Sequence, residues 1–246
     1  MRHEVKYNVH GKIVKRSLQT GGGSQVTMED SATPRSRRGL IGKRQAILDG
    51  ALTVFARDGY TRASVDAISA EAGVSTRTIY NHFTDKAELF LVVIQESAKQ
   101  AADIQIAIID RHLREVTDVE ADLIEFGRDW ATPRPDSAAH FSLVRQINAE
   151  ADHIPQEAID AWQETGPRRV RRELAGHLQR LASQGVLRIN DPDRAALHLL
   201  LLVSAGLPTS RSALSAEKIA ETVTAGVHTF LYGHVHRIDT PDTSDT

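Results

Sequence analysis

Residues 64–83 read SVDAISAEAGVSTRTIYNHF, and this stretch predicts two short helices joined by a glycine turn. Ser64 is a residue type that caps helix N-termini, and Ile68 and Ala72 recur one turn apart on the side expected to pack. Gly73 falls where a helix must end in a left-handed conformation, which a residue without a Cβ adopts at low cost. This outline is that of a helix-turn-helix, whose second helix fits the major groove of DNA.

The second helix carries the residues expected to read DNA. Ser75 is its predicted N-cap, with Ile79 and Phe83 pointing inward. Arg77 is the candidate for reading a base, because a guanidinium can bond guanine O6 and N7 together, and Thr76 can offer a hydroxyl and a methyl group to base edges. Thr78, Tyr80 and His82 are expected to grip phosphates, and Asn81 lies on the same outer face. The alternative is an ordinary helical hairpin with a solvated polar face.

The flanking sequence favours the DNA-binding interpretation. Residues 43–59 form an amphipathic pattern that ends at Gly59. Asp85 and Glu88 have the spacing of a capping box, with Asp in place of Ser or Thr, and open a long helix. Together these segments predict a three-helix DNA-binding head that leads into a fourth helix.

The run from Ala46 to Phe90, which includes FARDGY and TRASVDAISAEAGVSTRTIYNHFTDKAELF, resembles the N-terminal domain of the TetR family of bacterial transcriptional regulators. The motifs that carry the resemblance are Phe55 and Gly59 at the end of the first helix, Ile68 with Ala72-Gly73-Val74-Ser75 at the turn, and Tyr80, Phe83, Lys86 and Leu89 after it. The resemblance implies phosphate contacts for Tyr80 and Lys86. The sequence Thr76-Arg77-Thr78 is bulkier than the Gly-Thr or Pro-Thr that often follows the serine, so the operator cannot be inferred from relatives.

Charge is distributed unevenly along the chain. Residues 1–44 hold ten Lys or Arg and three acidic residues, which gives this segment a charge of +7. Because the net charge of the whole chain is −2, the other 202 residues carry −9. A basic segment beside a helix-turn-helix is the expected footprint of phosphate binding. We therefore add Arg37, Arg38 and Lys43 to the DNA-binding candidates, together with Ser64 at the N-terminus of its helix.

Composition narrows the class of protein. The chain of 246 residues is 41% hydrophobic and contains no cysteine, which excludes disulfides and thiolate metal sites. Its longest apolar stretch, residues 195–207, is too short to span a bilayer, and the N-terminus lacks a signal-peptide core, so we expect a cytoplasmic protein without a membrane partner. The pairs Glu150/His153 and His234/His236 lack the compact signature of a metal site. No catalytic motif is present, and we expect neither an enzyme nor a cofactor.

The predicted fold class is all-α, with a three-helix helix-turn-helix domain followed by a larger helical ligand-binding and dimerisation domain. We expect a flexible basic N-terminal extension at 1–40, in which Met28 is a possible start, the DNA-binding domain at 41–85, the larger domain at 86–235 and a tail at 236–246. In the larger domain, helices are expected at 86–113, 117–131, 137–151, 155–185 with an interruption at 166–167, 192–206 and 215–233.

Two surfaces of the larger domain are candidates for binding. The helices at about 192–207 and 215–233 are candidates for a homodimer interface, because the first is apolar nearly all round, although burial within the monomer explains the pattern equally well. The second helix has an apolar side formed by Ile219, Val223, Val227, Phe230 and Leu231. The resemblance implies the dimer, and it also implies an effector cavity. Its candidate lining residues are Phe90, Phe126, Trp130, His140, Phe141, His153 and Trp162.

Three functions compete at this point. The first is a ligand-responsive transcriptional regulator, usually a repressor, that binds a palindromic operator as a homodimer and is released by a small hydrophobic or aromatic effector. The second is an all-α ligand-binding or interaction protein whose helix-turn-helix is only structural. A helical enzyme is a distant third. Loss of DNA binding after substitution of Arg77 separates the first function from the second.

Overall fold

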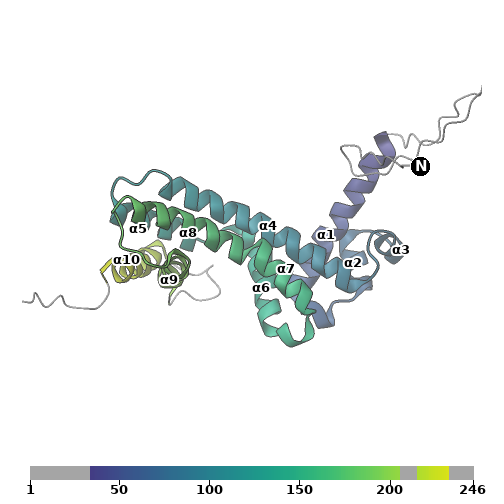
Figure 1. The fold of residues 1–246 in the computed structure, drawn as a ribbon. Coiled ribbons are helices and arrows are strands. Elements are labelled where there is room, and N and C mark those ends of the chain that lie inside the picture. Colours follow the sequence, from purple (N-terminus) through teal and green to yellow (C-terminus); the bar gives the residue numbers. More distant parts are fainter. Residues whose placement is uncertain (1–33, 206–214, 233–246) are drawn as a thin grey trace, which may run out of the picture. The chain divides into compact units, whose positions relative to one another are not determined.

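The computed structural model describes residues 34–205 and 215–232, and every regular element in these ranges is a helix (Figure 1). The chain divides into two units, residues 1–39 and 40–246. Met28, most of the expected N-terminal extension and the expected C-terminal tail lie outside the described residues. The all-α fold class predicted from the sequence is confirmed.

The head consists of the first three helices, which are α1 (Pro34–Arg62), α2 (Val65–Ala72) and α3 (Thr76–Tyr80). Helix α1 begins at Pro34 rather than at Lys43, so residues 34–40, which were expected to be flexible, have a helical backbone. Proline suits a first helical position because its fixed φ matches the helix and its missing N–H is not needed there. The regular helix breaks at Gly59, as the sequence predicted, with φ 81° and ψ 174°.

The larger domain is built from seven helices in the described residues. These are α4 (Lys86–Leu113), α5 (Val119–Ala131), α6 (Ala138–Ala149), α7 (Gln156–Thr165), α8 (Pro167–Ser183), α9 (Pro192–Ser204) and α10 (Ala216–Tyr232), with short 3-10 turns at Pro135–Ser137 and Ala151–His153. The bounds agree closely with the sequence-based expectations, and the interruption at residues 166–167 separates α7 from α8. None of the described helices is long and apolar enough to cross a membrane.

Two hydrophobic cores share helix α4. The first core joins α1, α2 and α3 to the first half of α4, α6 and α7, and includes Phe55, Ile79 and Ile94. The second core joins the last part of α4 to α5, α8, α9 and α10, and includes Ile109, Phe126 and Val203. One helix therefore contributes buried side chains both to the core of the head and to the core of the C-terminal helices.

The apolar side of α10 lies inside the monomer. Ile219, Val223 and Val227 are buried in the second core, and Phe230 and Leu231 pack against it half-buried. The expectation that this side forms a dimer interface was therefore wrong for the three buried residues, because α5 and α9 of the same chain already cover them. The large hydrophobic residues of α9 that remain exposed are Leu197 and Leu201, at 40% and 60%.

Helices α9 and α10 approach closely at a glycine. A Cβ added to Gly226 would lie 2.5 Å from the carbonyl oxygen of Leu202, so the backbones can meet only because this position lacks a side chain. We predict that Gly226→Ala destabilises the protein by about 1–3 kcal/mol, since a fixed backbone atom must move to admit the methyl group. Urea unfolding at one fixed protein concentration measures this change.

Gly176 supplies the matched control. It lies exposed within α8, and an added Cβ would meet nothing within 4 Å. Gly176→Ala should stabilise the protein by about 0.5–1 kcal/mol, because alanine loses less conformational entropy in a helix. Equal effects of the two substitutions would contradict the close packing of α9 on α10.

Candidate DNA-binding surface and effector region

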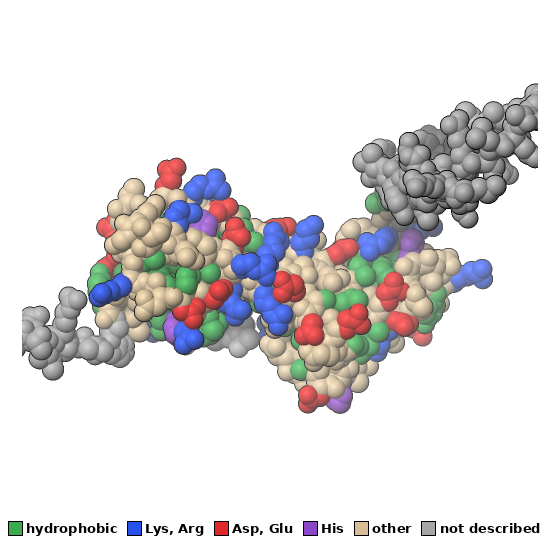
Figure 2. All heavy atoms as spheres, viewed as in Figure 1, with side chains coloured by type: hydrophobic (Ala, Val, Ile, Leu, Met, Phe, Trp, Pro, Cys, Tyr) green, Lys and Arg blue, Asp and Glu red, His purple; other side chains and the backbone are tan. Residues whose placement is uncertain are grey.

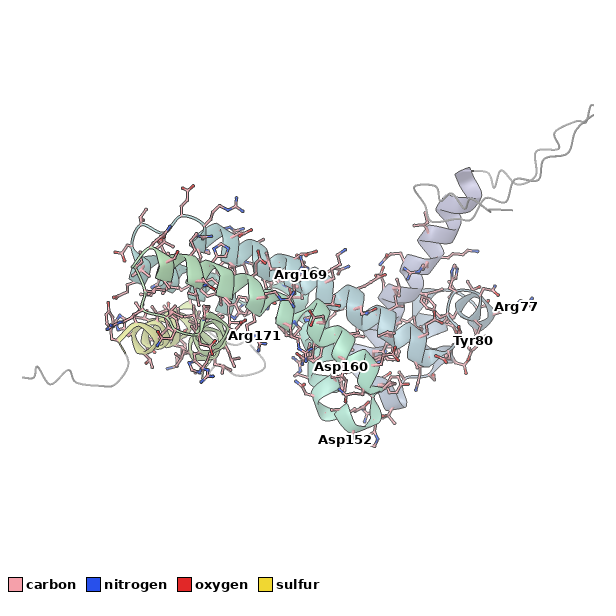
Figure 3. All side chains as sticks on the ribbon, viewed as in Figure 1. Arg77, Tyr80, Asp152, Asp160, Arg169 and Arg171 are labelled. Carbon is pink, nitrogen blue, oxygen red and sulfur yellow. The ribbon has the colours of Figure 1, made fainter. Side chains whose placement is uncertain are left out.

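Helix α3 has one buried side and one open side. Ile79 and Phe83 are only 1% and 3% exposed and anchor the helix in the first core. Arg77, Tyr80 and Asn81 are exposed, and Figure 3 shows Arg77 and Tyr80 projecting away from the rest of the head. The structure therefore places the proposed base-reading guanidinium where a DNA groove could reach it.

The turn before α3 is fixed by local hydrogen bonds that the sequence predicted. The hydroxyl of Ser64 accepts a hydrogen bond from the Ala67 amide at 3.1 Å, and the hydroxyl of Ser75 accepts one from the Thr78 amide at 3.1 Å. Gly73 adopts the left-handed conformation, with φ 64° and ψ 32°. These caps set the direction in which α3 leaves α2.

The other candidates on this surface are less open. Thr76, Thr78 and His82 are half-buried. The hydroxyls of Thr78 and Ser75 lie 2.9 Å apart, so the Thr78 hydroxyl already has a partner. Asn81 and His82 follow the regular part of α3, which ends at Tyr80 and is shorter than the sequence suggested. The Phe83 amide still donates to the Ile79 carbonyl at 2.9 Å, so the chain continues in a helical turn.

Lys86 is engaged within the head. Its ammonium donates hydrogen bonds to the carbonyl oxygens of Tyr60 at 3.0 Å and Ala63 at 3.1 Å, and it lies 4.7 Å from the centre of the Tyr60 ring. An ammonium has three protons to donate, and these contacts direct it to residues 59–63, the connector that leads from the break in α1 at Gly59 to α2. In this structure Lys86 holds the connector, whereas the resemblance had implied a phosphate contact.

The basic residues of α1 differ in position. Lys43 is exposed, and Arg37 and Arg38 belong to the helical backbone of α1, although their side chains lie outside the described part of the structure. Arg44 is half-buried, with its guanidinium 3.2 Å from the Glu96 carboxylate and 5.6 Å from the centre of the Phe83 ring. Arg44 therefore joins α1 to α4.

A second group of arginines lies at the start of α8. In Figure 2 the Lys and Arg side chains gather near the middle of the visible face, in the region of α4 and α8. Arg169 pairs with Asp103 at 2.7 Å, and Arg172 pairs with Glu164 at 2.6 Å. Because acidic partners offset much of this charge, the cluster is a weaker candidate for phosphate binding than α3.

The seven expected effector residues do not surround one cavity. Phe90 is 1% exposed in the first core, with its ring centre 4.9 Å from that of Phe55. Phe126 is fully buried in the second core, and its ring centre lies 5.7 Å from that of Trp130. His153 is exposed in a 3-10 turn. These four residues pack in two separate cores or lie at the surface.

The remaining three lie on α6 and α7, which both pack against α4. Nδ1 of His140 and the Ser97 hydroxyl lie 2.9 Å apart, and burial lowers the pKa of His140 to about 4. Phe141 follows on α6 and is 39% exposed. Trp162 is 6% exposed, and its indole N–H is buried without a hydrogen-bond partner among the described residues. A buried donor without a partner is unusual and marks this region as a candidate ligand contact.

A cavity of about 510 Å³ lies elsewhere, beside α9 and α10. Its walls come from the α8–α9 connection and from α9 and α10, and include Ile189, Arg194, His198, Leu202 and Phe230. None of the seven expected effector residues lines it. No sequence pattern indicated this cavity, because its residues come from three segments with no shared motif.

No group of three or more metal-binding side chains comes together in the described ranges. The Glu150 carboxylate, one half of a pair considered for metal binding, instead accepts hydrogen bonds from Thr61. The other pair, His234 and His236, lies outside the described residues.

Comparison with known proteins agrees with this geometry. Residues 47–93 match the bacterial regulatory proteins of the tetR family, and residues 122–233 match the C-terminal domain of AefR-like transcriptional repressors. The chain belongs to the TetR family of transcriptional regulators. TetR-family proteins are regulators and not enzymes, so the non-enzymatic reading of the sequence is confirmed.

Three relatives match this chain over most of their own length. The transcriptional repressor Rv1474c of Mycobacterium tuberculosis is 28% identical over an alignment of 184 residues, and the match covers 66% of this chain and 92% of that protein. A TetR-family regulator from Mesorhizobium loti is 29% identical, with a TM-score of 0.67 over 78% of this chain and 96% of its own. The flavonoid-responsive regulator FrrA is 30% identical, with a TM-score of 0.52 over 77% of this chain and 95% of its own.

The low pKa of His140 makes the stability of this TetR-family protein depend on pH. Its folded-state pKa of about 4 lies below the ordinary value of 6.5, so the unfolded chain binds the proton first as the pH falls. The contribution of neutral His140 to the free energy of unfolding is therefore fully present above pH 6.5 and is lost as the pH falls toward 4. Between pH 7 and pH 5 we predict a loss of about 2 kcal/mol from this residue.

His140→Gln tests this prediction, because glutamine keeps a polar contact to Ser97 but does not titrate. Urea unfolding of both proteins at pH 7 and pH 5 should show a smaller loss of stability in the variant. Equal losses in both proteins would mean that His140 titrates normally in the folded state.

Proposed function

We propose that this protein is a homodimeric transcriptional repressor that binds a palindromic operator through α3 and is released by a small hydrophobic or aromatic molecule. The observation that carries the proposal is the open face of α3, where Arg77 and Tyr80 are exposed on a helix anchored by Ile79 and Phe83. Among the described residues no carboxylate pairs with Arg77, so its guanidinium is available to a base or a phosphate. Its relatives in the TetR family are mostly repressors, which favours repression.

Contacts on the head divide into two kinds. Arg77 is the proposed base contact, with Thr76 beside it. Tyr80, Asn81 and Lys43 are exposed and suit phosphates, which fix the register of the protein on the duplex without specifying sequence. Ser64, Ser75, Thr78 and His82 act mainly by shaping or bordering this surface, and the amides at the start of α2 remain candidates for a phosphate. Lys86 acts indirectly by holding the α1–α2 connector.

We predict that Arg77→Ala weakens binding to the preferred DNA by about 1–3 kcal/mol and relaxes the preference at one base position per half-site. The DNA to be used is the set of fragments that the wild-type protein retains from a randomised duplex pool. Titration at several salt concentrations separates loss of a base contact from loss of general phosphate attraction.

Arg171→Ala is the matched control. Arg171 lies on α8 in the larger domain (Figure 3), and its substitution removes the same charge as Arg77→Ala does. The control should bind the selected DNA as the wild-type protein does. If Arg77→Ala also left affinity and base preference unchanged, α3 would not be the reading helix, and the second function, an interaction protein with a structural helix-turn-helix, would stand.

The dimer is proposed through α9. Leu197 and Leu201 lie one turn apart and remain 40% and 60% exposed after α10 and α5 have packed against the other sides of the helix. Exposed leucines one turn apart, on a helix whose other side is buried in the second core, mark an interaction surface. A two-fold dimer also places two recognition helices about one turn of DNA apart, as a palindromic operator requires.

We predict that Leu201→Glu yields monomers, because the substitution would bury two unpaired carboxylates at a two-fold contact. Sedimentation velocity at micromolar concentration measures the oligomeric state. Val186→Glu is the control, since Val186 is also exposed, at 46%, but lies on the α8–α9 connection. A wild-type protein that sediments as a monomer at this concentration would contradict the proposed interface.

The effector is proposed to bind between α4, α6 and α7. Ser97 and His140 supply polar groups there, and the indole N–H of Trp162 is a donor without a partner among the described residues. Neutral histidine and an apolar surround suit an uncharged molecule with an apolar or aromatic body and a hydrogen-bond acceptor. FrrA responds to flavonoids, which have this character. Adding such molecules to the DNA titration tests for release.

A further inference from the structure

The carboxylate of Glu150 joins the larger domain to the head. Glu150 is the residue that ends α6, and its Oε2 accepts hydrogen bonds from the Thr61 amide at 2.9 Å and from the Thr61 hydroxyl at 3.1 Å. Thr61 belongs to the connector, residues 59–63, which follows the break in α1 at Gly59. The two residues are 89 positions apart in the sequence, so this contact depends on the tertiary fold.

Gly59 makes room for this contact. Its φ of 81° is in the region that favours glycine, and a Cβ built there would lie 2.3 Å from Oε1 of Glu150 and 3.1 Å from the side-chain oxygen of Gln146. No larger residue could admit the carboxylate at this position without displacing it. The end of α6 therefore packs directly on the backbone of the connector.

Lys86 holds the same connector from α4. Its ammonium binds the carbonyl oxygens of Tyr60 and Ala63, which are neighbours of the residues that Glu150 contacts. The five residues of the connector are thus held by a cation from α4 and an anion from α6. The carboxylate accepts from the amide and the hydroxyl of Thr61, and the ammonium donates to two backbone carbonyl oxygens, so neither charged group can replace the other.

We infer that Glu150 is a positioning residue that couples the placement of α6 to the placement of the helix-turn-helix. Helix α6 carries His140 near its first turn and ends at Glu150, about 15 Å further along the helix axis. A displacement of α6 at His140 would move the carboxylate and pull the connector away from Lys86. This inference rests on the proposed function only for its consequence on DNA, because the coupling itself can be measured without DNA.

The absence of cysteine from the sequence makes a direct measurement practical. Spin labels on Ala70→Cys in α2 and Ala139→Cys in α6, both exposed positions, report the distance between the head and α6. Dilution with unlabelled protein restricts the signal to one chain. The wild-type background should give one narrow distance distribution by pulsed electron resonance.

Glu150→Ala should broaden or shift this distribution, because Thr61 loses both contacts with α6. Glu150→Gln keeps one acceptor oxygen and should therefore retain a distance distribution close to that of the wild-type protein. Thr61→Val keeps the backbone donor but loses the hydroxyl, so its effect should be intermediate. Glu157→Ala is the control, since Glu157 is an exposed glutamate on the neighbouring helix α7, and it should leave the distribution unchanged.

A second measurement links the coupling to DNA. If the head is held less firmly in the free protein, DNA binding must order it, and this ordering costs free energy. Glu150→Ala should therefore lower the affinity for the selected DNA about fivefold or more. A distance distribution unchanged in Glu150→Ala, or changed equally in Glu157→Ala, would overturn the inference. If Glu150→Ala does not fold, the intermediate effect of Thr61→Val decides. Failure of the wild-type protein to bind DNA would instead contradict the proposed function.

Discussion

The structure depends on one continuous helix that belongs to two hydrophobic cores. Helix α4 runs for 28 residues without a glycine or proline, which corresponds to about 42 Å. Its first half buries Leu89, Phe90 and Ile94 in the core of the head, and its last part buries Ile109 and Leu113 in the core of the C-terminal helices. Because closely packed interiors resist deformation, neither core can shift along α4 without straining the other. This shared helix gives the head and the larger domain a mechanical connection.

The sequence predicted the local structure because its signals are local. Apolar periodicity and glycine or proline punctuation located the helices, and Ser64, Ser75 and Asp85 cap them as expected. The start of α1 was placed too late, because the basic, turn-rich composition of residues 34–40 resembles a flexible segment. Phe90 and Phe126 were both expected to line one effector cavity, but they belong to different cores. A pattern along the chain could not separate them, because it does not identify neighbours in space.

The roles that the sequence missed all depend on contacts between distant segments. Lys86 matched a family motif, but only the fold shows that carbonyl oxygens of the connector occupy its ammonium. Glu150 was considered for metal binding together with His153, and the fold instead directs its carboxylate to Thr61. The apolar side of α10 was ambiguous between a dimer interface and a monomer core, and packing against α5 and α9 resolves Val223 and Val227 as core. A charged or apolar residue type therefore suggests an interaction but does not identify its partner.

In the proposed complex, two copies of the head read one duplex through α3. Hydroxyl-radical footprinting of the selected DNA tests it most directly, because this probe resolves which backbone positions a protein covers. A dimer bound in this way should protect two patches on one face of the duplex, related by a two-fold axis and centred about one helical turn, or 34–36 Å, apart. A single patch without two-fold symmetry, or protection that spreads evenly over every fragment tested, would contradict it.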